Sequence, residues 1–325
     1  MCIVTVTTTH PHYPLILLNN RDEYLHRPTA PACWWSPPHT YILGGYDLHR
    51  AEHGTWLGIT KQGRLACLTN FREEGAAIIQ GRRSRGAIVN AFLRAPPSAA
   101  HTESTKQAAQ KLIEEGVTGV GGFSLLFGHL SDLKNPTEGE KKGLAIVSNR
   151  STDVHGVDWL CGGPGETHAL SNANYGDTSW PKVVDAERLV AEAVGASVAA
   201  EEGEDDLITR LLGVLSRDTL PKQKQGEEWE IYLRQLRHSI FIPPIGNDSM
   251  EARKSGDEVA TGDGRGSTTV WDPTSGRYGT QKQSVILLDR EGRVTFLERT
   301  LFDEDGRPVP PERRDRRFTF DIEGW

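Results

Sequence analysis

Cys2 is the residue of this chain whose chemistry depends most on its position. Removal of Met1 would leave one residue that carries both a thiol and a free α-amine. A thiol with a pKa of about 8.5 is little ionised at neutral pH, but an α-amine with a pKa of about 8 can take its proton, directly or through water. The sequence therefore allows Cys2 to supply both the nucleophile and the general base of an acyl-transfer reaction.

Such a centre needs a cation that favours the thiolate, a group that orients the amine, and donors for an oxyanion. The run Asn20-Arg21-Asp22-Glu23 offers the cation in Arg21 and the carboxylate in Asp22. If this run ends a strand, alternation sends Arg21 and Asp22 to opposite faces, so both reach one site only where the strand bends or ends. The alternative interpretation is a solvated turn with ordinary ion pairs.

A later segment offers side-chain amides for the oxyanion. The run Ser171-Asn172-Ala173-Asn174 follows a glycine-rich loop and precedes the helix start Trp180-Pro181-Lys182. The amide of Asn172 or Asn174 can donate to an oxyanion, although asparagine in a turn usually bonds to its own backbone. On the residues alone, both interpretations stay open.

Metal ligation is a weaker prediction. Residues 49–53 match the H-x-x-E-H pattern in letters, but that zinc chemistry requires a helix with both histidines on one face. Glycines flank the segment and a strand-like run follows it, so we expect an exposed loop and no metal site. The four cysteines form no Cys-x-x-Cys pair and are predicted to be thiols.

Elements that could position these groups follow from hydrophobic periodicity and turn residues. Residues 2–8 and 15–20 form an opening hairpin around the turn-forming segment 10–14, which places residues 20–23 beside Cys2. Strands come first, helices in the middle and strands again at the end, which favours an α+β layered fold over a doubly wound sheet. Further strands are expected at 41–45, 55–60, 64–70, 123–128, 143–148, 284–289, 294–299 and 318–322, and helices at 84–93, 103–115, from 181, 207–215 and 227–238.

Composition excludes several classes of protein. The net charge of −7 leaves no basic stripe for a nucleic-acid groove. Apolar runs such as residues 14–18 fall far short of the roughly 20 residues that span a bilayer, so no integral membrane segment is expected. No signal sequence is visible, which favours a cytoplasmic location. Residues 246–267 lack large apolar side chains and are predicted to be a disordered insertion.

Many of these segments occur together in an order that resembles the NRDE family, also called the transport and Golgi organization 2 family. The resemblance runs from Met1 to the final strand, outside the acidic run at 201–206 and the insertion, so it implies a single domain over residues 1–325. It rests on these motifs: Cys2, Asn20-Arg21-Asp22-Glu23, Arg27-Pro28, Gly44-Gly45-Tyr46-Asp47, Gly54-Thr55-Trp56-Leu57-Gly58, Leu68-Thr69-Asn70, Ser84-Arg85-Gly86, Leu170-Ser171-Asn172, Trp180-Pro181-Lys182, Ile240-Phe241-Ile242 and Tyr278-Gly279-Thr280.

The resemblance implies a four-layer αββα sandwich of the N-terminal nucleophile hydrolase type, related to penicillin V acylase and bile salt hydrolase. In that fold Cys2 would be nucleophile and base, Arg21 the cation beside the thiolate, and Asp22 the carboxylate that orients the amine. Asn172 and Asn70 would be the oxyanion donors. The family commonly has arginine after Tyr-Gly-Thr, where this chain has Gln281, so a second cation is expected to be missing.

The resemblance leaves three functions open, because fold and activity are separable. The first is a cysteine amidohydrolase that cleaves linear C–N amide bonds and requires no cofactor. The second is a non-catalytic trafficking factor for haem or an acyl-CoA-like lipid ligand, with haem as cargo. The third is a Golgi-organising interaction protein without a small ligand. The family is linked to secretion, so Golgi or mitochondrial association is expected beside the cytoplasmic location.

Overall fold

The computed structural model describes residues 2–71, 85–98, 103–117, 121–134, 143–222, 235–246, 276–303 and 305–325. Apart from Gly246, the predicted insertion at 246–267 lies outside the described residues, as do the predicted helix cap at Ser84 and most of the predicted helix at 227–238. Among the described residues, no helix is long and apolar enough to cross a membrane.

The first sheet contains the first and the last strand of the described chain. Its six strands are antiparallel and lie in the order β10-β1-β2-β11-β12-β13. The opening hairpin is confirmed, and in its turn Nδ1 of His10 accepts the backbone N–H groups of His12 and Tyr13. The strands are β1 (Cys2–Thr7), β2 (Leu15–Tyr24), β10 (Thr167–Leu170), β11 (Tyr278–Leu288), β12 (Arg293–Thr300) and β13 (Asp315–Asp321).

The second sheet is a seven-stranded antiparallel meander in chain order from β3 to β9. Gly63 has a φ of 79° in the tight turn between β5 and β6, a conformation that glycine adopts without steric cost. The strands are β3 (Thr29–Trp34), β4 (Ile42–Asp47), β5 (Leu57–Thr60), β6 (Arg64–Asn70), β7 (Phe123–His129), β8 (Leu144–Ser148) and β9 (Asp158–Leu160).

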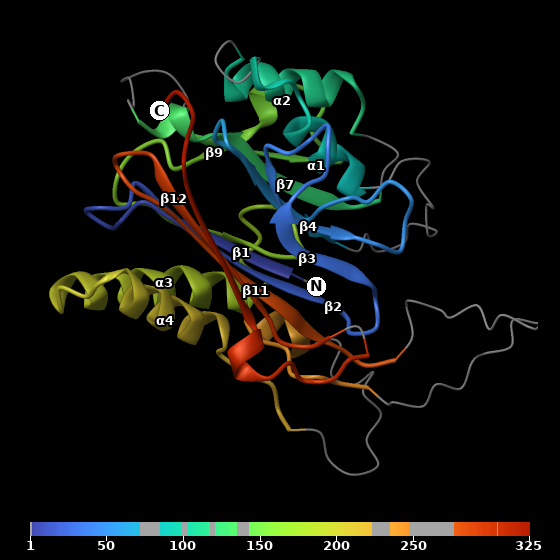
Figure 1. Cartoon of the computed structure of the whole chain (residues 1–325), viewed down its shortest axis with the longest axis vertical. Coiled ribbons are helices and arrows are strands. Elements are labelled where there is room, and N and C mark those ends of the chain that lie inside the picture. Colours follow the sequence, from blue (N-terminus) through green and yellow to red (C-terminus); the bar gives the residue numbers. More distant parts are fainter. Residues whose placement is uncertain are drawn as a thin grey trace, which may run out of the picture.

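Helices cover the outer face of each sheet, as Figure 1 shows. The pair α1 (Arg85–Leu93) and α2 (Thr105–Glu114) packs on the second sheet, and the pair α3 (Pro181–Ala199) and α4 (Glu204–Leu215) packs on the first. A separate apolar core fills the space between the two sheets. These layers confirm the predicted α+β fold with αββα order.

Three strands, β3, β9 and β10, escaped prediction, and β2 and β11 are longer than expected. The strand β3 contains Pro31, which argued against a strand, and β10 is a four-residue edge strand with two polar positions. The strand β2 continues past the predicted end at Asn20 to Tyr24, because β11 pairs with it along its whole length. This extension carries Arg21 and Asp22 inside the sheet, so the alternative of a solvated turn is wrong.

Candidate active site

Cys2 and Arg21 lie directly opposite each other in the antiparallel pair of β1 and β2. Cys2 is two positions from Val4 and Arg21 is four from Leu17, and both Val4 and Leu17 pack into the core between the sheets, so the Cys2 and Arg21 side chains lie on that face. The Arg21 guanidinium lies 4.5 Å from the centroid of the Trp56 ring. The face between the sheets therefore brings together a thiol and a buried cation.

Asp22 lies on the opposite face of β2, toward α3. Its Oδ1 accepts a hydrogen bond of 2.7 Å from the Thr280 hydroxyl, and its Oδ2 lies 3.9 Å from Nζ of Lys182. The pairing of β2 with β11 is irregular here, because Thr280 pairs with Asp22 while Lys282 pairs with Arg21, which leaves Gln281 as a bulge.

Arg21 and Asp22 lie on opposite faces of β2, yet both can lie close to Cys2 because β1 begins at that residue. Cys2 is the first residue of its strand. Arg21 flanks its thiol from the core side, and the backbone N–H of Asp22 donates to the sulfur. The positive charge of the amino terminus, which Met1 carries while it is present, acts on both Cys2 and Asp22. We expected the strand that carries Arg21 and Asp22 to bend or end at the site, but β2 continues to Tyr24, and it is β1 that begins there.

The segment after β10 binds the backbone of Cys2. The backbone N–H of Cys2 donates to Oδ1 of Asn172 at 2.8 Å, and the hydroxyl of Ser171 donates to the Cys2 carbonyl at 2.7 Å. The side-chain N–H of Asn172 donates to the backbone carbonyl of Asn70. The structure thus places Asn172 and Asn70 at Cys2; this arrangement uses one of the two side-chain N–H groups of Asn172, and the oxyanion role of both residues stays a prediction.

Burial dominates the electrostatics of the site. It raises the pKa of the Cys2 thiol, while the amino terminus and Arg21 act to lower it. It also raises the pKa of the Asp22 carboxyl, with the Lys182 ammonium as the largest opposing effect. Burial lowers the pKa of Lys182, and the negative charge of Asp22 acts in the other direction. The thiol needs its local base and cations if it is to ionise at neutral pH.

Gln281 lies where the resemblance implies an arginine, and it contacts the cation of the site. Its Oε1 accepts from the Arg21 guanidinium, and its Nε2 donates to the Leu25 carbonyl at 3.1 Å. The next residue, Lys282, is a buried cation that pairs with Glu298 at 3.2 Å. Gln281 therefore adds no second positive charge but fixes the position of the first.

Sequence reasoning gave no role to three buried residues of this cluster. The sequence shows them only as members of motifs, whereas in the structure each contacts Asp22 or Arg21: these residues are Lys182, Thr280 and Trp56. The one signal was Pro181, a residue that favours the first turn of a helix, and α3 indeed begins there. Pro181 predicts where the helix begins, but it does not predict that the side chain of the next residue, Lys182, points toward Asp22.

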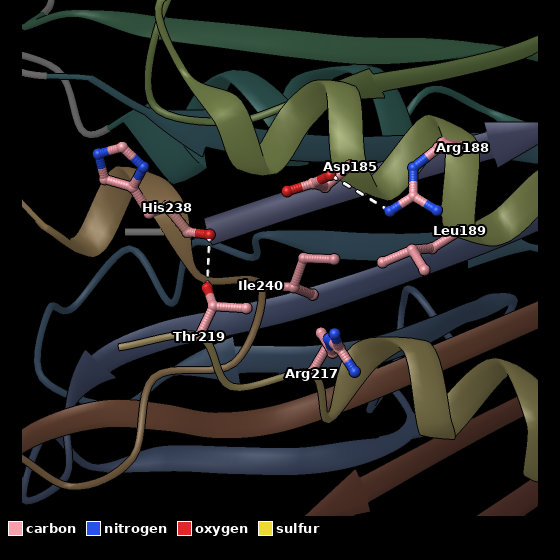
Figure 2. A pocket seen from close by; sticks show the side chains of 7 residues that line it. All are labelled: Asp185, Arg188, Leu189, Arg217, Thr219, His238 and Ile240. Atoms are coloured by element: carbon pink, nitrogen blue, oxygen red, sulfur yellow. Dashed lines mark hydrogen bonds and ion pairs between the residues drawn. The ribbon is translucent and has the colours of Figure 1, made fainter. Parts of the chain in front are cut away.

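Two other candidate regions lie apart from Cys2. Residues 49–53 form an exposed loop between β4 and β5, as predicted, and His53 stacks on Tyr46 at an interplanar angle of 16°. Within the described ranges, no group of three potential ligands could hold a metal ion. Figure 2 shows a pocket between α3 and the residues that follow α4, and none of its seven lining residues belongs to the Cys2 cluster.

Comparison with known proteins supports the sequence resemblance. The family model "Transport and Golgi organisation 2" matches residues 1–303. The chain is 30% identical to the transport and Golgi organization protein 2 homologs of Bos taurus and Homo sapiens, and each match covers 90% of this chain and 88% of the relative. A conjugated bile acid hydrolase from Clostridium perfringens matches over 99% of this chain and 97% of its own, with 10% identity and a TM-score of 0.43.

Proposed function

The chain belongs to the Transport and Golgi organisation 2 family, and we propose that it is a cysteine hydrolase that acts on linear C–N amide bonds through Cys2. One observation carries the proposal. A cysteine at position 2 begins a strand with Arg21 opposite its thiol, Asn172 on its backbone nitrogen, and the Asp22 carboxylate on the other side of the strand. Cys2 thus has the neighbours that a nucleophile with its own amine base requires.

In the mature chain the free α-amine of Cys2 takes the thiol proton, directly or through water. The sulfur then attacks the amide carbonyl, and a C–S bond forms as the carbonyl oxygen becomes an oxyanion. Collapse of this intermediate breaks the C–N bond, and the α-ammonium gives its proton to the leaving amine. Water, deprotonated by the same α-amine, then attacks the acyl-thioester, which releases the carboxylic acid and restores the thiol.

The surrounding residues have separate roles in this proposal. Arg21 favours the thiolate by its charge, and Gln281 holds Arg21 in place. Asp22 orients the α-amine from the helix side, and Ser171 fixes the Cys2 carbonyl. No cofactor enters any of these steps.

The proposal is tested on the intact chain in two stages. Intact-mass measurement should show that Met1 is removed, since retained Met1 would convert the amine base into an amide. A panel of N-acyl amines is then incubated with the wild type and with Cys2→Ala, and an acylated Cys2 peptide is sought by mass spectrometry. An acyl adduct on Cys2, together with hydrolysis that Cys2→Ala abolishes, supports the proposal. Full retention of Met1 would refute it.

Two observations favour a second candidate, a non-catalytic carrier of haem or of an acyl-CoA-like ligand. One of the two side-chain N–H groups of Asn172 is bound to the Asn70 carbonyl, and Cys2 is only 8% exposed. Titration with haem and with a long-chain acyl-CoA separates the two functions. Binding that is unchanged in Cys2→Ala and Arg21→Ala, with no hydrolysis of any amide, favours the carrier.

A further inference from the structure

Lys182 is a fully buried cation that the proposed reaction does not yet use. It is the second residue of α3, and its side chain has no exposed area. Among the described residues its Nζ has no hydrogen-bond acceptor, although an isolated buried ammonium is very costly. The single carboxylate that forms an ion pair with it in the described chain is Asp22, at 3.9 Å. The charge of Lys182 is therefore directed at the rear of the candidate active site.

Asp22 is equally buried and lies between Lys182 and the start of β1. Its side chain has no exposed area, and its Oδ1 accepts a hydrogen bond from the Thr280 hydroxyl. A neutral hydroxyl donor does not offset the negative charge of a buried carboxylate, so a cation close to Asp22 has a large effect on its ionisation. Lys182 supplies that cation from a different layer of the fold.

We infer that Lys182 is a positioning residue that keeps Asp22 in its carboxylate form, and thereby lets Asp22 hold the α-amine of Cys2 for proton transfer. This inference rests on the proposed function, because it assigns Asp22 the task of orienting that amine. Lys182 itself touches no reacting atom in this scheme. It acts through Asp22, whose pKa burial raises and the Lys182 ammonium lowers.

The pair also avoids an electrostatic conflict. A lone buried carboxylate beside the α-amine would stabilise the ammonium form and so leave less free amine to accept the thiol proton at neutral pH. With Lys182 beside it, Asp22 belongs to a pair with no net charge, and it can orient the amine without strongly raising the amine's pKa. The same cation thus keeps Asp22 ionised and limits the effect of Asp22 on the base.

Few other charged or titratable groups act on this pair. Asp22 is affected by Lys182, the amino terminus and Arg21, with the Thr280 hydroxyl as a neutral donor. Lys182 is affected by Asp22 and by Cys2. Arg21 lies on the other face of β2, where Gln281 and Glu23 contact its guanidinium. Lys182 thus acts on the Asp22 carboxylate from the helix side, at 3.9 Å.

The inference is tested by titrating Asp22 itself. Carboxyl resonances of ¹³C-aspartate are followed against pH in the wild type and in Lys182→Met, and Asp22→Asn assigns the Asp22 signal by its loss. Because an opposite charge within about 4 to 6 Å lowers a carboxyl pKa by roughly 1 to 3 units, the midpoint should rise by about 1 pH unit or more in Lys182→Met. Lys182→Gln serves as the second variant if Lys182→Met does not fold.

Arg64→Met is the matched control, since Arg64 is a fully buried cation whose carboxylate partner is Glu103, away from Cys2. It should leave the Asp22 midpoint unchanged. An unchanged midpoint in folded Lys182→Met or Lys182→Gln, or an equal shift in Arg64→Met, would overturn the inference. The titration needs no substrate, so a shift without any amide hydrolysis would retain the Lys182 assignment and refute only the proposed function.

Discussion

Replacing Thr280 by valine removes one oxygen atom from the centre of the candidate site while keeping the shape of the side chain. The Thr280 hydroxyl donates to Asp22 Oδ1 at 2.7 Å and accepts the backbone N–H of Ile242 at 2.9 Å. Thr280 has no exposed area, so water cannot replace either bond without a local opening. The variant therefore leaves two buried groups without these partners and creates almost no cavity.

The expected cost follows from the two bonds. A hydrogen bond to a charged group contributes about 1.5 to 3 kcal/mol, and a buried N–H group left without a partner costs about 1 to 3 kcal/mol. Because partial relaxation can recover part of each, we expect Thr280→Val to lower the free energy of unfolding by about 3 kcal/mol. That is a large share of the roughly 5 to 15 kcal/mol that a typical domain has.

The assay is urea denaturation at neutral pH, with equal slopes required before midpoints are compared. Thr69→Val is a matched control, because Thr69 is also fully buried but its hydroxyl has no hydrogen-bond partner among the described residues. That change should be neutral within about 0.5 kcal/mol or stabilising. A loss below about 1 kcal/mol for Thr280→Val, or an equal loss for Thr69→Val, would refute the reasoning about Thr280.

Three further predictions concern separate parts of the fold. Burial lowers the pKa of His129 to about 4 from 6.5, so the unfolded chain binds this proton more readily than the folded chain. The contribution of neutral His129 to the free energy of unfolding is fully present above pH 6.5, and it should fall by about 3 kcal/mol as the pH drops toward 4. A series of acid denaturation measurements should show this loss in the wild type and not in His129→Leu. Gly86→Ala should destabilise the protein by about 2 kcal/mol, because the added Cβ would lie 2.7 Å from the Gly54 Cα; this clash outweighs the better helix propensity of alanine. Thermal unfolding measures the change in stability, and a stabilised variant would contradict the predicted contact. Arg21→Met should raise the pKa of the Cys2 thiol further, because the Arg21 charge acts to lower it, and should slow its alkylation by iodoacetamide roughly tenfold at neutral pH. An unchanged rate would show that Arg21 does not act on the thiol.

Local sequence patterns predicted most of the elements because those patterns are set by burial on one face. The hairpin of β1 and β2, the final hairpin of β11 and β12, and the start of α3 at Pro181 follow from alternation, turn residues and helix-start signals. The strands β3, β9 and β10 were missed because their pairing partners, rather than their own residues, make them strands.

Some residues of the candidate site could likewise be predicted from the sequence, and others could not. The sequence indicated Cys2, Arg21 and Asp22 through their types and through the hairpin that brings residues 20–23 beside residue 2. It could not indicate Lys182 and Thr280 as neighbours of Asp22, because these residues are separated from Asp22 by 160 and 258 positions and reach it only when α3 and β11 pack against β2.

The sequence by itself determined the position of the thiol, the hairpin around it and the layered α+β class, since these depend on residues close together in the chain. Only the tertiary structure decided that β1 begins where β2 is still paired, so that Arg21 and Asp22 flank one residue from opposite faces. It also decided that Asp22 meets a buried lysine. The physical reason is that ionisation of a buried group depends on every charge within a few ångströms, and those charges come from segments that only folding brings together.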